Sequence, residues 1–162
     1  MDDIEVMAEG LAFPEGPVAL GDGSVLVAEI RGGFVKRVQP GGRVDVVADC
    51  KGGPNGLAIG PDDALYVCNN GGNTHRPDHF VATRPAAGHA PRPPPRVDLA
   101  TGEVRTLYSH CGAQRLSSPN DLVFDEYGGF YFTDMGKKRA RDRDHGGIYY
   151  ATIDRPHINE GG

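Results

Sequence analysis

Apolar residues in this chain occur in short runs separated by Gly, Asp and Pro, and the runs come in pairs. Three such pairs align without a gap, each beginning at a proline: "PEGPVALGDGSVLVAE" (14–29), "PNGLAIGPDDALYVCN" (54–69) and "PNDLVFDEYGGFYFTD" (119–134). An apolar strand, a turn containing Gly or Asp, and a second apolar strand form a β-hairpin signature. The pattern therefore predicts three antiparallel hairpins, with first strands at 17–20, 57–60 and 122–125.

Further apolar runs extend each hairpin towards a four-stranded unit; they lie at 32–39, 43–50, 102–109 and 146–154. The first two copies start 40 residues apart (14 to 54) and the next two 65 apart (54 to 119). A repeat of about 40 residues with four strands is typical of a β-propeller blade. The Pro-rich segment 71–96 accounts for the longer interval, as a loop inserted between two strands of one blade.

The repeat count predicts an incomplete ring. Propellers close with four to eight blades, whereas this sequence contains three repeats, the last of which we expect to stop after its third strand, in "RPHINEGG". We therefore predict an all-β chain that forms one partial β-propeller domain over residues 1–162. An open arc of blades leaves an apolar face at each end, so we expect self-association through the open ends.

Composition and charge narrow the possible partners. The chain has 162 residues, of which 24 are Gly and 13 are Pro, a usage that suits short strands and tight turns. Its net charge of −5, with two aspartates interrupting the basic segment "GKKRARDRDH" (136–145), argues against nucleic acid as a partner. We find no secretion signal or membrane segment and expect a cytoplasmic protein. The three cysteines form no CxxC pair and are interpreted as small buried side chains.

Glu15, Asn55 and Asn120 occupy one column of the alignment, directly after the proline that opens each copy. Equivalent positions on the innermost strands of a propeller face the central channel at one depth, so these side chains are expected to converge. Because Ca²⁺ takes six to eight oxygens from carboxylates, amides and water, such a column can surround one hard cation. The alternative is that Asn beside Gly simply forms a turn, which applies more to Asn55 than to Glu15.

Three other acidic or amide side chains form a second column, which consists of Glu29, Asn69 and Asp134. Each lies at the end of the second strand of its copy, so the column either makes turn and strand-end contacts or faces the channel. Asp121, beside Asn120, either supports the site from behind or caps a turn.

The segments "PEGPVAL", "PNGLAIGPDDALYV" and "SSPNDLVFDEYGGFYFTDMG" resemble the gluconolactonase family, also called the senescence-marker-protein or regucalcin-like family, from Phe13 to Ile153. The resemblance implies a six-bladed propeller, present here as its N-terminal half, that hydrolyses sugar lactones with a bound divalent metal, Ca²⁺ or Zn²⁺. It assigns Glu15 of "EGP" as a metal ligand and Asn120 of "SPND" to the metal and the substrate. Asn55 is assigned as a further substrate contact.

The chemistry implied by this resemblance needs a metal that polarises the lactone carbonyl and a carboxylate that activates water. The family's general-base aspartate belongs to later blades, which we expect beyond the end of this chain, so no catalytic residue is assigned and hydrolysis is expected to be incomplete. The alternative function is a catalytically silent propeller fragment or a protein-interaction module. The carboxylate at position 15 favours a hydrolase, because an interaction propeller does not need an acid in an axial column.

Overall fold

The structure, a computed structural model, describes residues 4–74, 84–85, 94–137, 141–153 and 155–160. Every regular element in these ranges is a β-strand, which confirms the all-β prediction. None of the described residues forms a helix that is long and apolar enough to cross a membrane.

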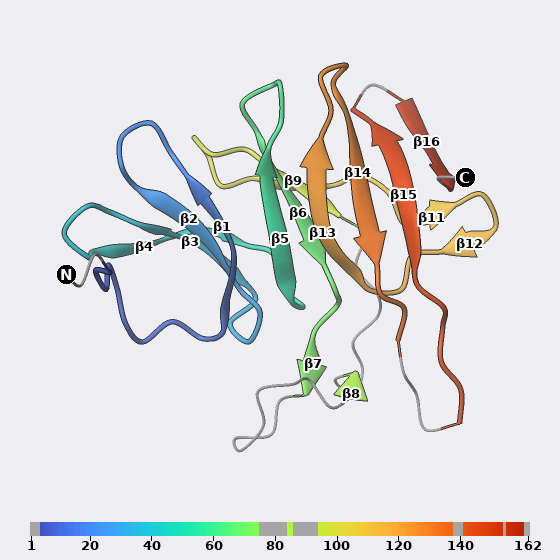
Figure 1. Cartoon of the computed structure of the whole chain (residues 1–162), viewed down its shortest axis with the longest axis horizontal. Helices are drawn as coiled ribbons and strands as arrows, with labels where there is room; N and C mark the ends of the chain where they lie inside the picture. The colour runs from blue at the N-terminus through green and yellow to red at the C-terminus, as the bar shows by residue number, and fades with distance from the viewer. Residues whose placement is uncertain (1–3, 75–83, 86–93, 138–140, 154, 161–162) are drawn as a thin grey trace.

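Twelve of the strands form three antiparallel four-stranded sheets (Figure 1). The first sheet has the order β1 (Pro14–Ala19), β2 (Val25–Glu29), β3 (Phe34–Val38) and β4 (Val44–Asp49). The second has the order β10 (Val104–Thr106), β9 (Pro95–Val97), β6 (Leu65–Asn69) and β5 (Pro54–Ile59). The third has the order β13 (Pro119–Phe124), β14 (Gly129–Asp134), β15 (Gly147–Thr152) and β16 (Arg155–Glu160).

Two short ribbons complete the described strands. One pairs β7 (Asn73–Thr74) with β8 (Arg84–Pro85), and the other pairs β11 (His110–Cys111) with β12 (Gln114–Arg115). The β7–β8 ribbon belongs to the predicted insertion 71–96, which does connect two strands of one sheet, β6 and β9. Residues 75–83 and 86–93 of that insertion lie outside the described residues.

The three sheets are arranged as neighbouring blades whose inner strands, β1, β5 and β13, lie side by side. This confirms the predicted partial propeller, although the inner strands begin earlier than predicted. Each starts at its proline because Pro14, Pro54 and Pro119 already pair with the end of the second strand. The assignment of residues 1–162 to one domain stays a prediction.

The prediction that the third repeat stops after its third strand was wrong. Residues 155–160, which include most of "RPHINEGG", form β16, and this strand pairs with β15 to give the third sheet four strands. The sequence pattern missed it because "RPHINE" lacks the apolar run that marks the other strands, and the pairing is determined by the backbone of β15.

The alternation of side chains along β6 separates two apolar cores. Leu65 and Val67 face the first sheet, in a core with Leu26 and Val35. The intervening residues of β6 face the third sheet, where the second core contains Tyr66, Cys68, Phe130 and Phe132. Tyr66 meets the ring of Phe130 at a centroid distance of 5.6 Å. Each face of the middle sheet is therefore covered by a neighbouring blade, as the period of two along a strand requires.

Glycines allow the inner strands to approach each other closely. A Cβ on Gly16 would collide with the carbonyl oxygen of Asn55 and lie 2.9 Å from the backbone nitrogen of Leu57. A Cβ on Gly56 would lie 2.5 Å from Cα of Asp121 in the next inner strand. Because these obstacles are mostly backbone atoms, which cannot rotate away, the spacing between blades depends on having no side chain at either position.

The cysteines behave largely as predicted. Cys50 and Cys68 are buried in the two cores, Cys111 is half-buried, and no disulfide joins them. Burial, with a smaller contribution from Asp49, raises the pKa of the Cys50 thiol to about 12. Burial, together with the Asp121 and Asp134 carboxylates, raises the pKa of the Cys68 thiol well above its usual range.

The close approach of the blades predicts the effect of adding one methyl group. Gly56→Ala should lower the free energy of unfolding by about 1–3 kcal/mol, because neighbouring backbone must move to admit the Cβ. Gly21→Ala is the matched control, since a Cβ there meets nothing within 4 Å, and it should change stability by less than about 1 kcal/mol. Equal denaturation midpoints for the two variants would contradict this account.

The thiol environments predict selective alkylation of the folded chain. The thiolate is the reactive form, so at about pH 8 the raised pKa values and burial should protect Cys50 and Cys68 from iodoacetamide while Cys111 is labelled. Peptide mass spectrometry of native and denatured samples measures this. Rapid labelling of Cys68 before unfolding would show that the core between the second and third sheets is open.

Candidate functional site

A buried polar side chain ends the second strand of each sheet: Glu29 in β2, Asn69 in β6 and Asp134 in β14. Their exposed fractions are 2%, 0% and 5%. Each accepts hydrogen bonds from the backbone segment that leads into the inner strand of its own sheet. Of the two interpretations left open by the sequence, the strand-end role is the one that these contacts confirm.

In the first two sheets this contact is made one or two residues before the inner strand. Oε1 of Glu29 accepts from the backbone N–H of Ala12 at 2.8 Å and from Nζ of Lys36 at 2.9 Å. Oδ1 of Asn69 accepts from the backbone N–H of Gly53 at 3.0 Å. Its Nδ2 donates to the carbonyls of residues 50 and 51, so the whole amide is used to hold the entering chain.

The third sheet uses a carboxylate in the same place. Asp134 accepts from the backbone N–H of Ser117 at 2.6 Å and of Ser118 at 2.7 Å. Lys137 follows on the next segment, and its Nζ is buried without a hydrogen-bond partner among the described residues. Burial lowers the pKa of Lys137, whereas the carboxylates of Asp134 and Asp144 oppose that shift. The Asp134 carboxylate therefore holds the entry to the third inner strand, with the buried Lys137 ammonium nearby.

Every inner strand carries a β-bulge immediately after this anchored entry. The register with the second strand shifts near the start of each inner strand, between Glu15 and Val18, between Pro54 and Leu57, and between Pro119 and Leu122, which is one residue later in the first sheet than in the other two. A bulge adds one unpaired residue, bends the strand and redirects side chains, and bulges are frequent beside functional sites. Here the bulges include or directly follow the column residues 15, 55 and 120.

The redirected residues surround one hollow with a volume of about 270 Å³. Its lining consists of Glu15, Gly16, Pro17, Asn55, Gly56, Asn120 and Asp121. All three members of the predicted column therefore meet at one place, between three neighbouring inner strands. Their roles as metal ligands or substrate contacts stay predictions.

Asn55 and Asn120 are joined directly. Nδ2 of Asn55 donates to Oδ1 of Asn120 at 2.8 Å, a contact between two blades and 65 residues apart in sequence. Asn55 thus reaches across the hollow instead of only shaping its own turn. An amide oxygen has two lone pairs, so Oδ1 of Asn120 keeps one for a further partner while its direction is set by Asn55.

The donor set suits a hard divalent cation. One carboxylate and two amides offer oxygen ligands of the kind that Ca²⁺ prefers, whereas Zn²⁺ sites are usually built from nitrogen and sulfur. The described residues contain no group of three or more His, Cys, Asp or Glu side chains that could hold a metal. The residues fit part of a calcium-type oxygen shell, which contains six to eight oxygens in total.

Asp121 makes hydrogen bonds within its own hairpin and also lines the hollow. Its Oδ1 accepts from the backbone N–H of Leu122 at 2.9 Å, and its own N–H donates to Oγ1 of Thr133 at 3.3 Å, so it stabilises the bulge. It also lines the hollow beside Asn120.

Gly16 and Gly56 were not recognised from the sequence as part of the site. The alignment contained the signal, because a glycine directly follows the column residue in the first two copies and an aspartate in the third.

Two sequence comparisons with known proteins point to the same family. Residues 13–160 match the SMP-30/gluconolactonase/LRE-like region. A gluconolactonase from Zymomonas mobilis is 26% identical over 145 residues, which cover 81% of this chain and 35% of that protein. The chain thus spans about a third of the length of this relative.

Solved structures with the same fold include a gluconolactonase from Xanthomonas campestris, with a TM-score of 0.72 and 23% identity over 96% of this chain and 49% of that one. A calcium-binding protein, regucalcin, from Agrobacterium tumefaciens has a TM-score of 0.60 and 16% identity, covering 94% of this chain and 43% of its own. At these identities the structural likeness concerns the fold. The sequence match over residues 13–160 shows that this chain belongs to the SMP-30/gluconolactonase/LRE-like family.

Proposed function

We propose that this chain contributes to the hydrolysis of sugar lactones at the hollow between its inner strands. The observation that carries the proposal is the meeting of Glu15, Asn55 and Asn120 at one hollow, in a chain that belongs to the gluconolactonase-like family. A gluconolactonase of Zymomonas mobilis is among its relatives, which supports a lactone as the substrate class.

Glu15 and Asn120 would hold a divalent cation, with Ca²⁺ favoured over Zn²⁺ by their oxygen donors. When bound, the cation supplies polarisation of the lactone carbonyl and stabilises the charge that develops on its oxygen. Support for the Glu15 assignment comes from its place directly before the bulge of β1, among the residues that line the hollow.

Asn120 would orient the lactone through its amide, and Asn55 would position Asn120. The hydrogen bond from Nδ2 of Asn55 restrains the Asn120 side chain, which lowers the entropy lost when a substrate hydroxyl or carbonyl contacts it. Neither asparagine can act as a base near neutral pH. We expect the general base to be a residue other than those of this hollow that hold the cation. We also expect slow turnover by this chain alone.

This function predicts that divalent cation binding depends on the Glu15 carboxylate. Glu15→Gln should weaken Ca²⁺ binding at least about tenfold by calorimetry, from an affinity already on the order of 10⁻³ M, because a charged oxygen ligand becomes a neutral one. Glu126→Gln, at an exposed carboxylate in the β13–β14 turn, is the matched control and should bind as the unmodified chain does.

The same variants should be followed in a pH-stat assay with sugar lactones, with and without a chelator. Lactone turnover that is slow, metal-dependent and lost in Glu15→Gln is the expected result. Tight Ca²⁺ or Zn²⁺ binding that survives this substitution would remove Glu15 from the metal site, and brisk turnover in the presence of the chelator would contradict metal assistance.

A further inference from the structure

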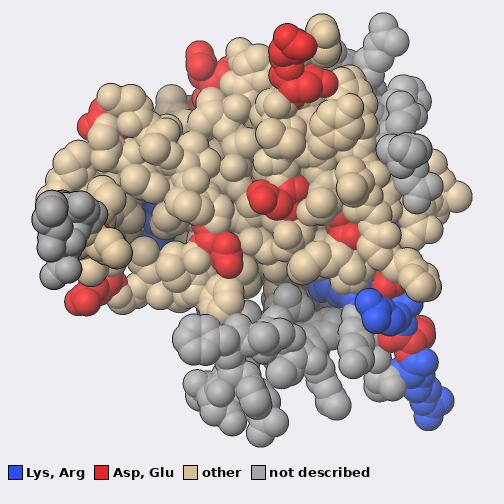
Figure 2. All heavy atoms as spheres, viewed as in Figure 1, with Lys and Arg blue, Asp and Glu red and all other residues tan. Residues whose placement is uncertain are grey.

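The connection between β14 and β15 buries a lysine, Lys137. Figure 2 shows basic and acidic side chains gathered at the lower right of the view, where this connection lies in Figure 1. Arg141 and Arg143 of the same connection are exposed, whereas Lys137 is only 8% exposed and its Nζ meets no hydrogen-bond acceptor among the described residues. Burying an ammonium without an acceptor costs free energy, so its surroundings must compensate for the charge.

Two carboxylates meet beside this lysine, at Ser117. Oδ2 of Asp134 accepts from the backbone N–H of Ser117 at 2.6 Å, and Oδ2 of Asp144 accepts from its hydroxyl. Oδ2 of Asp144 also accepts from the N–H of Lys137 at 3.2 Å, and the Asp144 N–H donates to the Lys137 carbonyl at 2.9 Å. Two like charges that meet at one residue repel each other. The fixed backbone of Lys137 brings a positive charge to the same place.

The anchors of the other two sheets indicate when a lysine is needed. In the first sheet the anchor is the carboxylate of Glu29, and Nζ of Lys36 donates to it at 2.9 Å. In the second sheet the anchor is the neutral amide of Asn69, and the nearby Lys51 pairs its ammonium with Asp49 at 2.9 Å instead. In the part of the chain that the structure describes, a lysine thus accompanies each charged anchor, whereas the neutral anchor is held by backbone groups.

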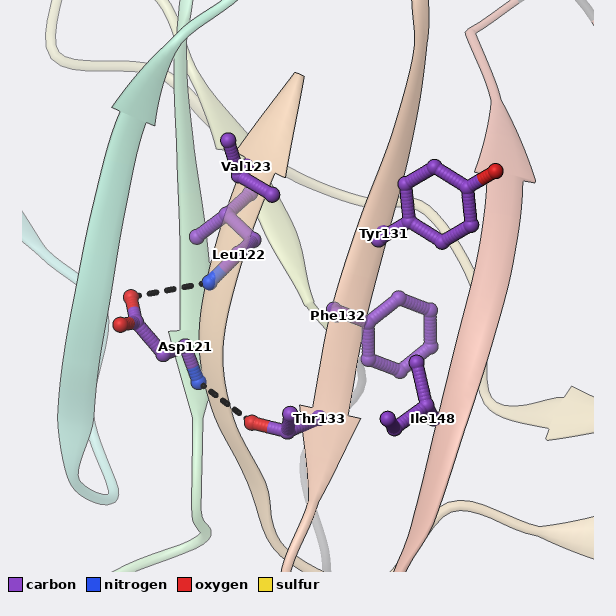
Figure 3. A pocket seen from close by; sticks show the side chains of 7 residues that line it. All are labelled: Asp121, Leu122, Val123, Tyr131, Phe132, Thr133 and Ile148. Carbon is purple, nitrogen blue, oxygen red and sulfur yellow. Dashed lines mark hydrogen bonds between the residues drawn. The ribbon is translucent and has the colours of Figure 1, made fainter. Parts of the chain in front are cut away.

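Asn120 lies between two points at which the chain of the third inner strand is held. Before it, Asp134 binds the backbone N–H groups of residues 117 and 118. After it, the N–H of Asp121 donates to Oγ1 of Thr133 at 3.3 Å (Figure 3). The second point uses a neutral acceptor, and only the first depends on a buried carboxylate. The direction of the Asn120 side chain therefore depends on how firmly Asp134 holds the preceding residues.

We propose that Lys137 is a positioning residue of the hollow: its ammonium balances the charges of Asp134 and Asp144 and so fixes the chain that carries Asn120. It acts through its charge, because its Nζ makes no hydrogen bond to the described residues. The link to cation binding rests on the proposed function, in which Asn120 holds the cation. The anchoring of residues 117 and 118 does not depend on that function.

Hydrogen exchange at the backbone amides of Ser117 and Ser118, followed by NMR, tests the anchoring. Lys137→Met removes the charge and keeps a side chain of similar length, so exchange at both amides should become at least about tenfold faster. Lys51→Met is the matched control: it removes one charge at the entry to the second inner strand, where Lys51 pairs at the surface, and should leave both amides unchanged. Equal exchange rates in Lys137→Met and the unmodified chain would overturn the proposal.

A second substitution separates charge from packing. Asn69 shows that an amide can serve as an anchor, because its Oδ1 accepts from the two N–H groups equivalent to those bound by Oδ1 of Asp134. Asp134→Asn added to Lys137→Met should therefore recover part of the lost protection, whereas Asp134→Asn alone should reduce it. If Lys137→Met alone does not fold, the double variant should restore the fold. Simple addition of the two effects, or failure of both variants to fold, would overturn charge balance as the role of Lys137.

Calorimetry with Ca²⁺ tests the link to the hollow. The dissociation constant should rise at least about threefold in Lys137→Met and stay unchanged in Lys51→Met, although both variants lose one positive charge. Unchanged affinity together with faster amide exchange would overturn the link between Lys137 and the hollow. Absence of Ca²⁺ binding in the unmodified chain would contradict the proposed function instead, and the amide exchange would still decide whether Lys137 anchors the third inner strand.

Discussion

The backbone N–H groups that lead into each inner strand must find acceptors, and the rest of the structure depends on how this is done. Leaving such a buried donor unpaired costs about 1–3 kcal/mol. Glu29, Asn69 and Asp134 supply the acceptors from the end of the second strand of the same sheet. Each blade thus determines for itself where its inner strand starts. The side chains at positions 15, 55 and 120 follow within a few residues, so the same hydrogen bonds also determine where they lie.

The hollow results from two further constraints that act on these anchored starts. A bulge near the start of every inner strand redirects the chain, and Gly16 and Gly56 let adjacent bulges approach to a distance that a Cβ would forbid. The hydrogen bond between Asn55 and Asn120 is a consequence of this approach. The geometry of the site is therefore a property of the blade repeat, while its chemistry comes from the residue types in one column.

A propeller fold by itself does not specify a reaction, because one fold carries many chemistries. For this chain the proposal of lactone hydrolysis rests on two observations, the carboxylate and amides of the hollow and the family to which the chain belongs. Asp121 stabilises the third bulge, lines the hollow beside Asn120 and borders the exposed face of the third sheet.

Local patterns in the sequence determined the strands of the hairpins, the three blades and the column of Glu15, Asn55 and Asn120, because strand periodicity and turn residues act over a few positions. They did not reveal β16, whose pairing depends on the backbone of β15. Nor could they decide whether Glu29, Asn69 and Asp134 face the channel or hold the backbone. That choice, like the contact of Asn55 with Asn120, was made by the tertiary structure, because it depends on which strands lie side by side after segments far apart in sequence have packed.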